Sequence, residues 1–140
     1  MTDTAMAMGP ALVAECTESL DNMLAETNGM IMGMVATSDG FVVASVTAPG
    51  WSVDPNRIAA MASSGHALGE TVANELAHGK CNNVIIDTDQ LSIVFLSVPG
   101  TDDSPLILGV AATKSVSLGT VLYGAKHCTK RLSETVNTVL

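Results

Sequence analysis

Residues 54–79 read DPNRIAAMASSGHALGETVANELAHG, and the predicted fold is built around this segment. Asp54 is a good N-cap because its carboxylate can accept hydrogen bonds from free backbone N–H groups, and Pro55 suits the first helical position. Gly79 can adopt the left-handed conformation that ends many helices. The sequence therefore predicts one helix from Asp54 to Gly79, roughly 36 Å long at about 1.5 Å per residue.

The two sides of this predicted helix differ in composition. Apolar and small residues recur at helical spacing and predict a stripe that packs on a sheet: Ile58, Met61, Ala62, Gly65, Leu68, Val72, Ala73 and Leu76. The opposite side carries small, mostly polar residues: Ala60, Ser63, Ser64, Ala67, Thr71 and Asn74. Small side chains let another backbone approach closely, so this side is expected to meet a second protein, most simply another copy of the chain. The alternative is an Ala-rich helix side exposed to water.

The composition indicates one domain with a covered apolar surface. The chain has 140 residues, of which 47% are hydrophobic and 14% are charged, and its mean hydropathy is +0.38. No apolar run reaches the ~18 residues of a membrane-spanning helix, since Met30–Val46 is interrupted by Ser38-Asp39-Gly40. The N-terminus lacks the pattern of a signal peptide. A surface covered by a protein partner explains the high hydropathy better than a membrane.

Charge and cysteine content exclude further classes. The formal net charge is −8, from six basic and fourteen acidic residues, which argues against a nucleic-acid partner. Three of the basic residues, Lys126, Lys130 and Arg131, lie together near the C-terminus. The cysteines are odd in number and far apart: Cys16, Cys81 and Cys128. They are expected to be reduced thiols in a cytoplasmic protein.

Periodicity and turn residues predict the other elements. After a flexible tail at 1–10, a single domain is expected over 11–140. Its elements are a helix from Pro10 to Asn28, strands at 30–37, 41–46, 83–87, 91–98 and 106–112, and a last helix capped by Ser117. The expected fold class is α+β: a three-layer α/β/α sandwich. Its central five-stranded antiparallel sheet has the long helix on one face and the two terminal helices on the other.

The methionines of the first predicted strand raise a choice between core and partner groove. Strict alternation places Met30, Met32 and Met34 on one sheet face. Methionine fills irregular gaps in a core and also lines adaptable binding surfaces, and core is the favoured interpretation.

The order of these pieces resembles the Roadblock/dynein light chain family, in particular its bacterial GTPase-regulator-like branch. The segment GMVATSDGFVVAS at 33–45 is similar to the first hairpin of the family, with its Asp-Gly turn. The helix at 57–78, the strand LILGVA at 106–111 and the helix entry SLGTV at 117–121 also match. The resemblance covers about Leu12 to Val139.

This resemblance implies a non-enzymatic protein. It implies a homodimer or heterodimer in which the long helices pair and the outer strands of the second hairpins join two sheets. Relatives bind small Ras-like GTPases as regulators or scaffolds, or attach to motor complexes, and a bacterial branch stimulates hydrolysis by a gliding-polarity GTPase. The Met-rich tail and the loop around Trp51 depart from the family pattern, which leaves the partner open.

The resulting hypothesis is a cytoplasmic homodimer that binds a small Ras-like GTPase and modulates its nucleotide cycle. The residues expected at the dimer or partner interface are Trp51, Arg57, Ala60, Ser63, Ser64, Ala67, Thr71 and Asn74. Arg57 could reach phosphate charge, but a surface salt bridge is its more common role. The alternatives are a structural adaptor subunit of a kinase, receptor or motor complex, and a small-molecule sensor.

Catalytic, cofactor and metal sites are not expected. Polar residues at four-residue steps along the long helix could bind a metal: His66, Glu70, Asn74 and His78. They lack a third strong ligand and the HExxH motif. Gly79-Lys80 lacks the preceding glycine and the following Ser or Thr of a phosphate-binding loop, and Ser63 and Ser64 lack the GxSxG turn of a nucleophile.

Overall fold

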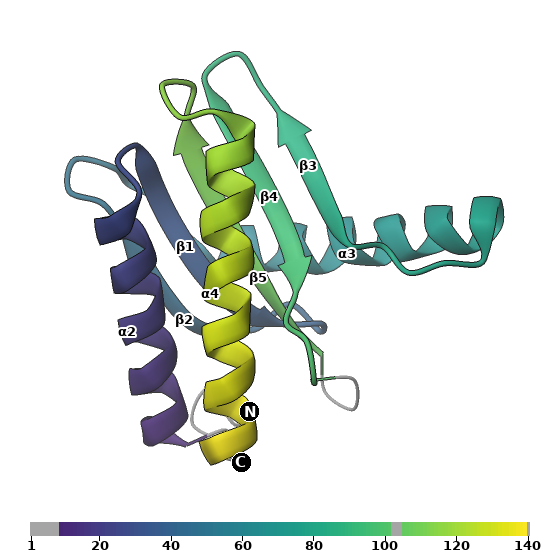
Figure 1. Ribbon diagram of the computed structural model, residues 1–140, viewed down its shortest axis with the longest axis horizontal. Coiled ribbons are helices and arrows are strands. Elements are labelled where there is room, and N and C mark those ends of the chain that lie inside the picture. The colour runs from purple at the N-terminus through teal and green to yellow at the C-terminus, as the bar shows by residue number, and fades with distance from the viewer. Residues whose placement is uncertain (1–8, 102–104, 140) are drawn as a thin grey trace.

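The computed structural model describes residues 9–101 and 105–139, and within these ranges helices and strands follow the predicted order (Figure 1). The elements are α2 (Pro10–Glu26), β1 (Met30–Thr37), β2 (Val42–Thr47), α3 (Pro55–Ala77), β3 (Asn83–Asp87), β4 (Leu91–Ser97), β5 (Leu106–Thr113) and α4 (Leu118–Val139). The expected tail at 1–10 lies largely outside the described residues, and Pro10 already belongs to α2. None of the described helices is long and apolar enough to cross a membrane.

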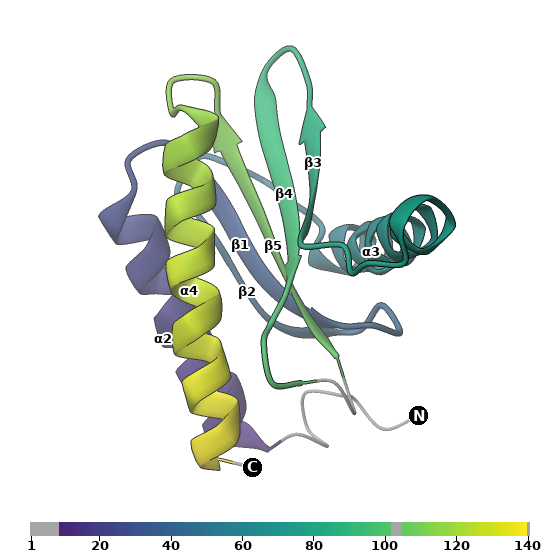
Figure 2. The same ribbon diagram turned by 45° about the vertical axis from the view of Figure 1, so that its right-hand side comes forward.

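The strands form one antiparallel sheet in the order β2-β1-β5-β4-β3. β1 and β5 lie at its centre, where Val35 pairs with Leu108, and both strands are buried along nearly their whole length. The α2 and α4 helices cover one face and α3 crosses the other (Figures 1 and 2). This arrangement confirms the predicted three-layer sandwich.

The sheet separates two hydrophobic cores. On the α2 and α4 side, the largest fully buried side chains include Leu12, Leu20, Leu108 and Leu132. On the α3 side, the core is smaller, and Phe95 is its one aromatic residue among those described. Apolar residues on both faces of a central strand serve both cores.

The prediction that Met30, Met32 and Met34 share one sheet face is wrong for Met30. All three are buried, as a core role requires. However, Met32 and Met34 belong to the core under α3, whereas Met30 belongs to the core under α2 and α4. The register between β1 and β5 shifts between Met30 and Met32, and such an irregularity reverses the side on which the preceding residue lies.

The helix ends show the expected N-caps and one unexpected C-cap. The Asp54 carboxylate accepts a hydrogen bond from the backbone N–H of Asn56 at 3.0 Å, and Ser117 Oγ accepts one from Thr120 N–H at 3.2 Å. The left-handed residue after α3 is His78, with φ 53°, and not Gly79 as predicted. The helix therefore ends one residue earlier than the glycine suggested.

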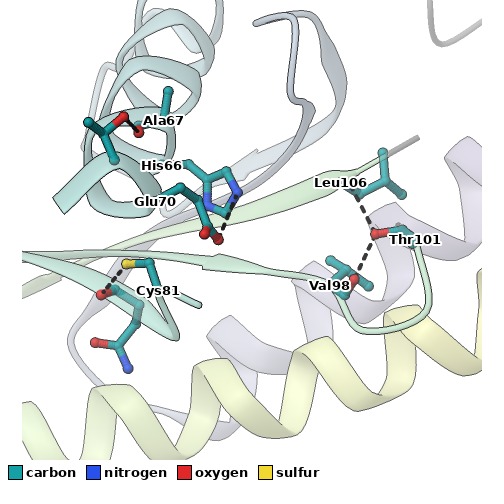
Figure 3. Close-up of polar contacts among 9 residues, drawn as sticks. His66, Ala67, Glu70, Cys81, Val98, Thr101 and Leu106 are labelled. Carbon is teal, nitrogen blue, oxygen red and sulfur yellow. Dashed lines mark hydrogen bonds and ion pairs between the residues drawn. The ribbon is translucent and has the colours of Figure 1, made fainter. Parts of the chain in front are cut away.

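Thr101 bonds to the end of β4 and to the start of β5. Its buried hydroxyl donates a hydrogen bond to the Val98 carbonyl at 2.6 Å and accepts one from Leu106 N–H at 3.1 Å (Figure 3). The two bonds join the residue that follows β4 to the first residue of β5 through one side chain.

Candidate protein-interaction surface

The α3 helix contacts the sheet through small residues. Ala59 and Ala62 are fully buried against it. A Cβ atom at Gly65 would lie 3.2 Å from the Phe95 ring, and one at Gly69 would lie 2.6 Å from Cys81 Sγ. The absence of side chains at these positions lets the helix backbone lie close to the strands.

Because small residues occupy most of the sheet side, most of the large apolar residues of α3 point elsewhere, whereas Ile58 near its start packs on the core as predicted. Four of them are exposed, by 55%, 65%, 48% and 82% respectively: Met61, Leu68, Val72 and Leu76. The prediction that these four pack on the sheet is therefore wrong. The helix has two apolar stripes, and only the one made mainly of small residues is covered within the chain. Leaving a large apolar side chain in water forgoes up to about 1.5–3 kcal/mol of burial free energy.

The exposed stripe continues to the edge of the sheet. The last turns of α3 extend beyond β3, so no strand lies under them (Figures 1 and 2). β3 is one of the two edge strands, and its outer edge has no partner among the described residues. Ile86 is exposed. It lies two residues after Val84, so it is on the same face of the sheet, the face that α3 covers. We call Met61, Leu68, Val72, Leu76 and Ile86 the α3–β3 surface.

The sequence-predicted interface residues lie mostly on the same outward half of α3, beside this apolar stripe. Six of the seven that lie on α3 are exposed: Arg57, Ala60, Ser64, Ala67, Thr71 and Asn74. Figure 3 shows Ala67 on the side of the helix away from the sheet. The apolar residues themselves were missed because they had been assigned to the sheet. The four-residue steps from Leu68 through Val72 to Leu76 were the available signal.

Three of the predicted polar groups already have partners within the chain. The half-buried Ser63 hydroxyl donates a hydrogen bond to the Ser38 carbonyl in the turn of the first hairpin. The Thr71 hydroxyl donates to the Ala67 carbonyl at 2.9 Å. The Arg57 side chain, 81% exposed, lies 3.8 Å from the Asp54 carboxylate, as expected for a surface ion pair.

Trp51 lies apart from the helix residues with which it was grouped. It borders an open cleft of about 490 Å³ between the C-terminal end of α2 and the segment that follows β2. Asp21, Leu24 and Pro49 share this cleft, and no α3 residue lines it. The structure therefore places Trp51 at a different surface from Ala67 and its neighbours.

Part of the row His66, Glu70, Asn74 and His78, which was considered as a metal site, faces the sheet. His66 and Glu70 are half-buried, lie 3.8 Å apart and point toward the sheet (Figure 3). Among the described residues, no group of three potential ligands is placed to hold a metal ion.

The cysteines are free thiols, and two of them are buried between α2 and α4. Burial raises the pKa of Cys16 from 9.0 to about 11 and the pKa of Cys128 from 9.0 to about 12. Both side chains therefore remain neutral at physiological pH and act as core residues.

Comparisons with known proteins agree with this architecture. MglB in a structure described as a tetrameric arrangement is 17% identical; the match covers 93% of each chain, with a TM-score of 0.81. Myxococcus xanthus MglB is 15% identical over 91% of this chain and 92% of that one, with a TM-score of 0.79. A Roadblock/LC7 domain from Streptomyces avermitilis is 15% identical over 88% and 92% of the two chains, with a TM-score of 0.65.

At these identities the structural matches show a shared fold. No curated protein matches this chain by sequence alone. The sequence model of the Roadblock/LC7 domain, however, matches residues 17–100, which is more than half of the chain. Fold and sequence pattern agree, and the chain belongs to the Roadblock/LC7 domain family.

Proposed function

We propose that this protein is a non-enzymatic regulator or scaffold that forms a homodimer in the cytoplasm and binds a small Ras-like GTPase. The observation that carries the proposal is the α3–β3 surface, where exposed apolar side chains adjoin an unpaired strand edge. A second copy related by a two-fold axis would place α3 beside α3 and β3 beside β3. This pairing would bury the apolar stripe and satisfy the free backbone groups of β3.

The small polar side of α3 would remain available in such a dimer. Ala60, Ser64, Ala67 and Asn74 present short side chains, so the backbone of a partner can approach the two helices closely. A GTPase changes the conformation of its switch segments with its nucleotide. A surface that binds one switch conformation more tightly shifts the population toward it and so changes hydrolysis or exchange.

The comparisons support this proposal at the level of family and fold. One of the similar structures is described as MglB in a tetrameric arrangement, and another as a gliding protein, MglB, from Thermus thermophilus. Self-association of a relative with the same fold makes self-association of this chain the first arrangement to test.

The experiment places a charge on the proposed GTPase side. Ala67→Glu adds a bulky carboxylate on the outward side of α3, and Ala14→Glu adds the same group at an exposed position of α2. Binding to a Ras-like GTPase from the same organism is measured by calorimetry, and single-turnover GTP hydrolysis is measured with and without the protein. We expect Ala67→Glu to abolish both binding and the change in hydrolysis, while Ala14→Glu retains them.

Each outcome separates the candidate functions. Binding that depends on Ala67 but leaves hydrolysis and exchange unchanged would favour the adaptor alternative. GTPase binding that survives Ala67→Glu would refute the assignment of this side of α3 to the GTPase.

A further inference from the structure

The outer side of α4, on the opposite face of the sheet from α3, concentrates positive charge in an acidic protein. Three of the six basic residues of the chain lie on this helix, whereas Glu134 is its one acidic residue. The chain as a whole carries a formal charge of −8. The positive charge is therefore a local feature of α4.

Two of these basic groups have no acidic partner among the residues that the structure describes. Arg131 lies 3.8 Å from the Glu26 carboxylate of α2, so its charge is partly matched within the chain. Lys126 and Lys130 are exposed, and neither has a carboxylate within 4.0 Å among the described residues. Their ammonium groups remain free to meet an acidic group from outside.

Apolar and aromatic surface lies beside the two lysines. The Tyr123 and His127 rings are stacked, with centroids 6.4 Å apart and planes inclined by 20°, and Tyr123 is 66% exposed. An open, shallow hollow of about 460 Å³ runs along this side of the helix. Its lining residues are Gly119, Leu122, Tyr123, Lys126, His127 and Lys130. Exposed aromatic rings are enriched where proteins meet other proteins.

Gly119 lines the hollow and has no packing role against the other described residues. A Cβ atom at this position would meet no other atom within 4 Å. Glycine weakens a helix by about 1 kcal/mol relative to alanine, and here no close approach to the sheet compensates for that loss. The missing side chain instead leaves room next to Tyr123.

This surface is independent of the α3–β3 surface. Figure 2 shows α4 and α3 in different layers, separated by the sheet. The flank of α4 that carries Arg131 faces α2, whereas the side with Lys126 and Lys130 faces outward. Dimerisation through α3 and β3 would therefore leave it accessible.

We propose that the outer side of α4 is a docking surface for a short acidic segment of a partner protein that carries an apolar residue. The two free lysines would pair with carboxylates of the segment, and the Tyr123 ring would cover its apolar side chain. A short segment is favoured over an extended polyanion because the positive charge spans little more than one helical turn. The remaining negative charge of the protein opposes a DNA strand or an anionic membrane at distances up to the Debye length of about 10 Å.

The test uses labelled peptides of Asp and Glu with either Leu or Ser at the centre. Binding is measured by fluorescence anisotropy at low and raised salt, and the contact site is mapped by amide chemical-shift changes. We expect salt-sensitive binding of the Leu peptide with shifts confined to α4. Lys126→Glu and Lys130→Glu should each weaken binding by about fivefold, whereas Lys80→Glu, an equal charge change at another exposed lysine, should alter it less than twofold.

Tyr123→Ala tests the apolar half of the surface, and its side chain is exposed enough for the fold to survive. We expect it to remove the preference for the Leu peptide over the Ser peptide, with an unchanged melting temperature. The proposal is overturned if neither peptide binds, if Lys80→Glu weakens binding as much as Lys126→Glu, or if the shifts lie outside α4. Binding to phosphatidylserine vesicles without peptide binding would also overturn it, in favour of a membrane surface.

Discussion

Gly69→Ala tests whether the α3 helix depends on close contact with the sheet. The added Cβ atom would lie 2.6 Å from Cys81 Sγ and 2.9 Å from Val84 Cγ2. Cys81 Sγ is held by a contact with the Asn83 carbonyl at 3.3 Å. A β-branched valine has few alternative side-chain conformations, so neither neighbour can move without cost.

The expected magnitude follows from two opposing terms. Overpacking of this kind costs about 1–3 kcal/mol, whereas replacing glycine by alanine within a helix gains about 1 kcal/mol. The free energy of unfolding should therefore fall by up to about 2 kcal/mol. Gly119→Ala in α4 is the matched control, because its Cβ atom meets nothing within 4 Å. It should raise stability by about 1 kcal/mol.

Urea unfolding at one fixed protein concentration measures both variants. The same comparison in a Cys81→Ala background should give a smaller penalty for Gly69→Ala, because the nearest atom is removed. Equal gains in stability for Gly69→Ala and Gly119→Ala would refute the conclusion that glycine at position 69 is required by the sheet contact.

Two further predictions concern buried polar groups. Thr101→Val removes the hydroxyl that bonds the Val98 carbonyl and Leu106 N–H, so we expect a loss of about 1–3 kcal/mol, measured by urea unfolding. For Cys16 and Cys128, burial raises the pKa to about 11 and about 12, respectively, so folding favours the neutral thiols. The contribution of the neutral thiols to the free energy of unfolding is fully present below the ordinary thiol pKa of 9.0. It is lost as pH rises from 9 toward 12. Stability should therefore fall above about pH 9, and the Cys16→Ala/Cys128→Ala variant should show a smaller decline over the same range.

The sequence predicted the architecture because the local signals agree with one another. Asp54 and Ser117 mark helix starts, the Asp39-Gly40 pair marks a hairpin turn, and the strands of the sheet centre are apolar on both faces. Each signal depends on a few neighbouring residues, so it can be read without the fold. The shift in register after Met30 depends on the pairing of distant strands, so no local pattern predicts it.

The sequence predicted only part of the candidate interaction surface, and the reason is physical. Hydrophobic periodicity shows that a stripe is covered, but it does not show by what. The stripe that contains Leu68 and Val72 has the same period as one that packs on a sheet. The second stripe, with Ala62, Gly65 and Gly69, is weakly hydrophobic, although it makes the closest contact with the strands. Two stripes on one helix, one of small side chains and one of large side chains, therefore indicate two packing partners.

Solution mass by light scattering tests the proposed homodimer most directly. The wild-type protein and the Ala14→Glu control should have a mass of about twice 14.4 kDa. Leu68→Glu removes an exposed apolar side chain from both halves of the proposed interface. Each lost side chain forgoes about 1.5–3 kcal/mol of burial free energy, so the change should weaken the dimer at least about a hundredfold. A mass of 14.4 kDa for Leu68→Glu at micromolar concentration would support the α3–β3 interface. A monomeric wild-type protein, or a Leu68→Glu variant as dimeric as the control, would contradict it.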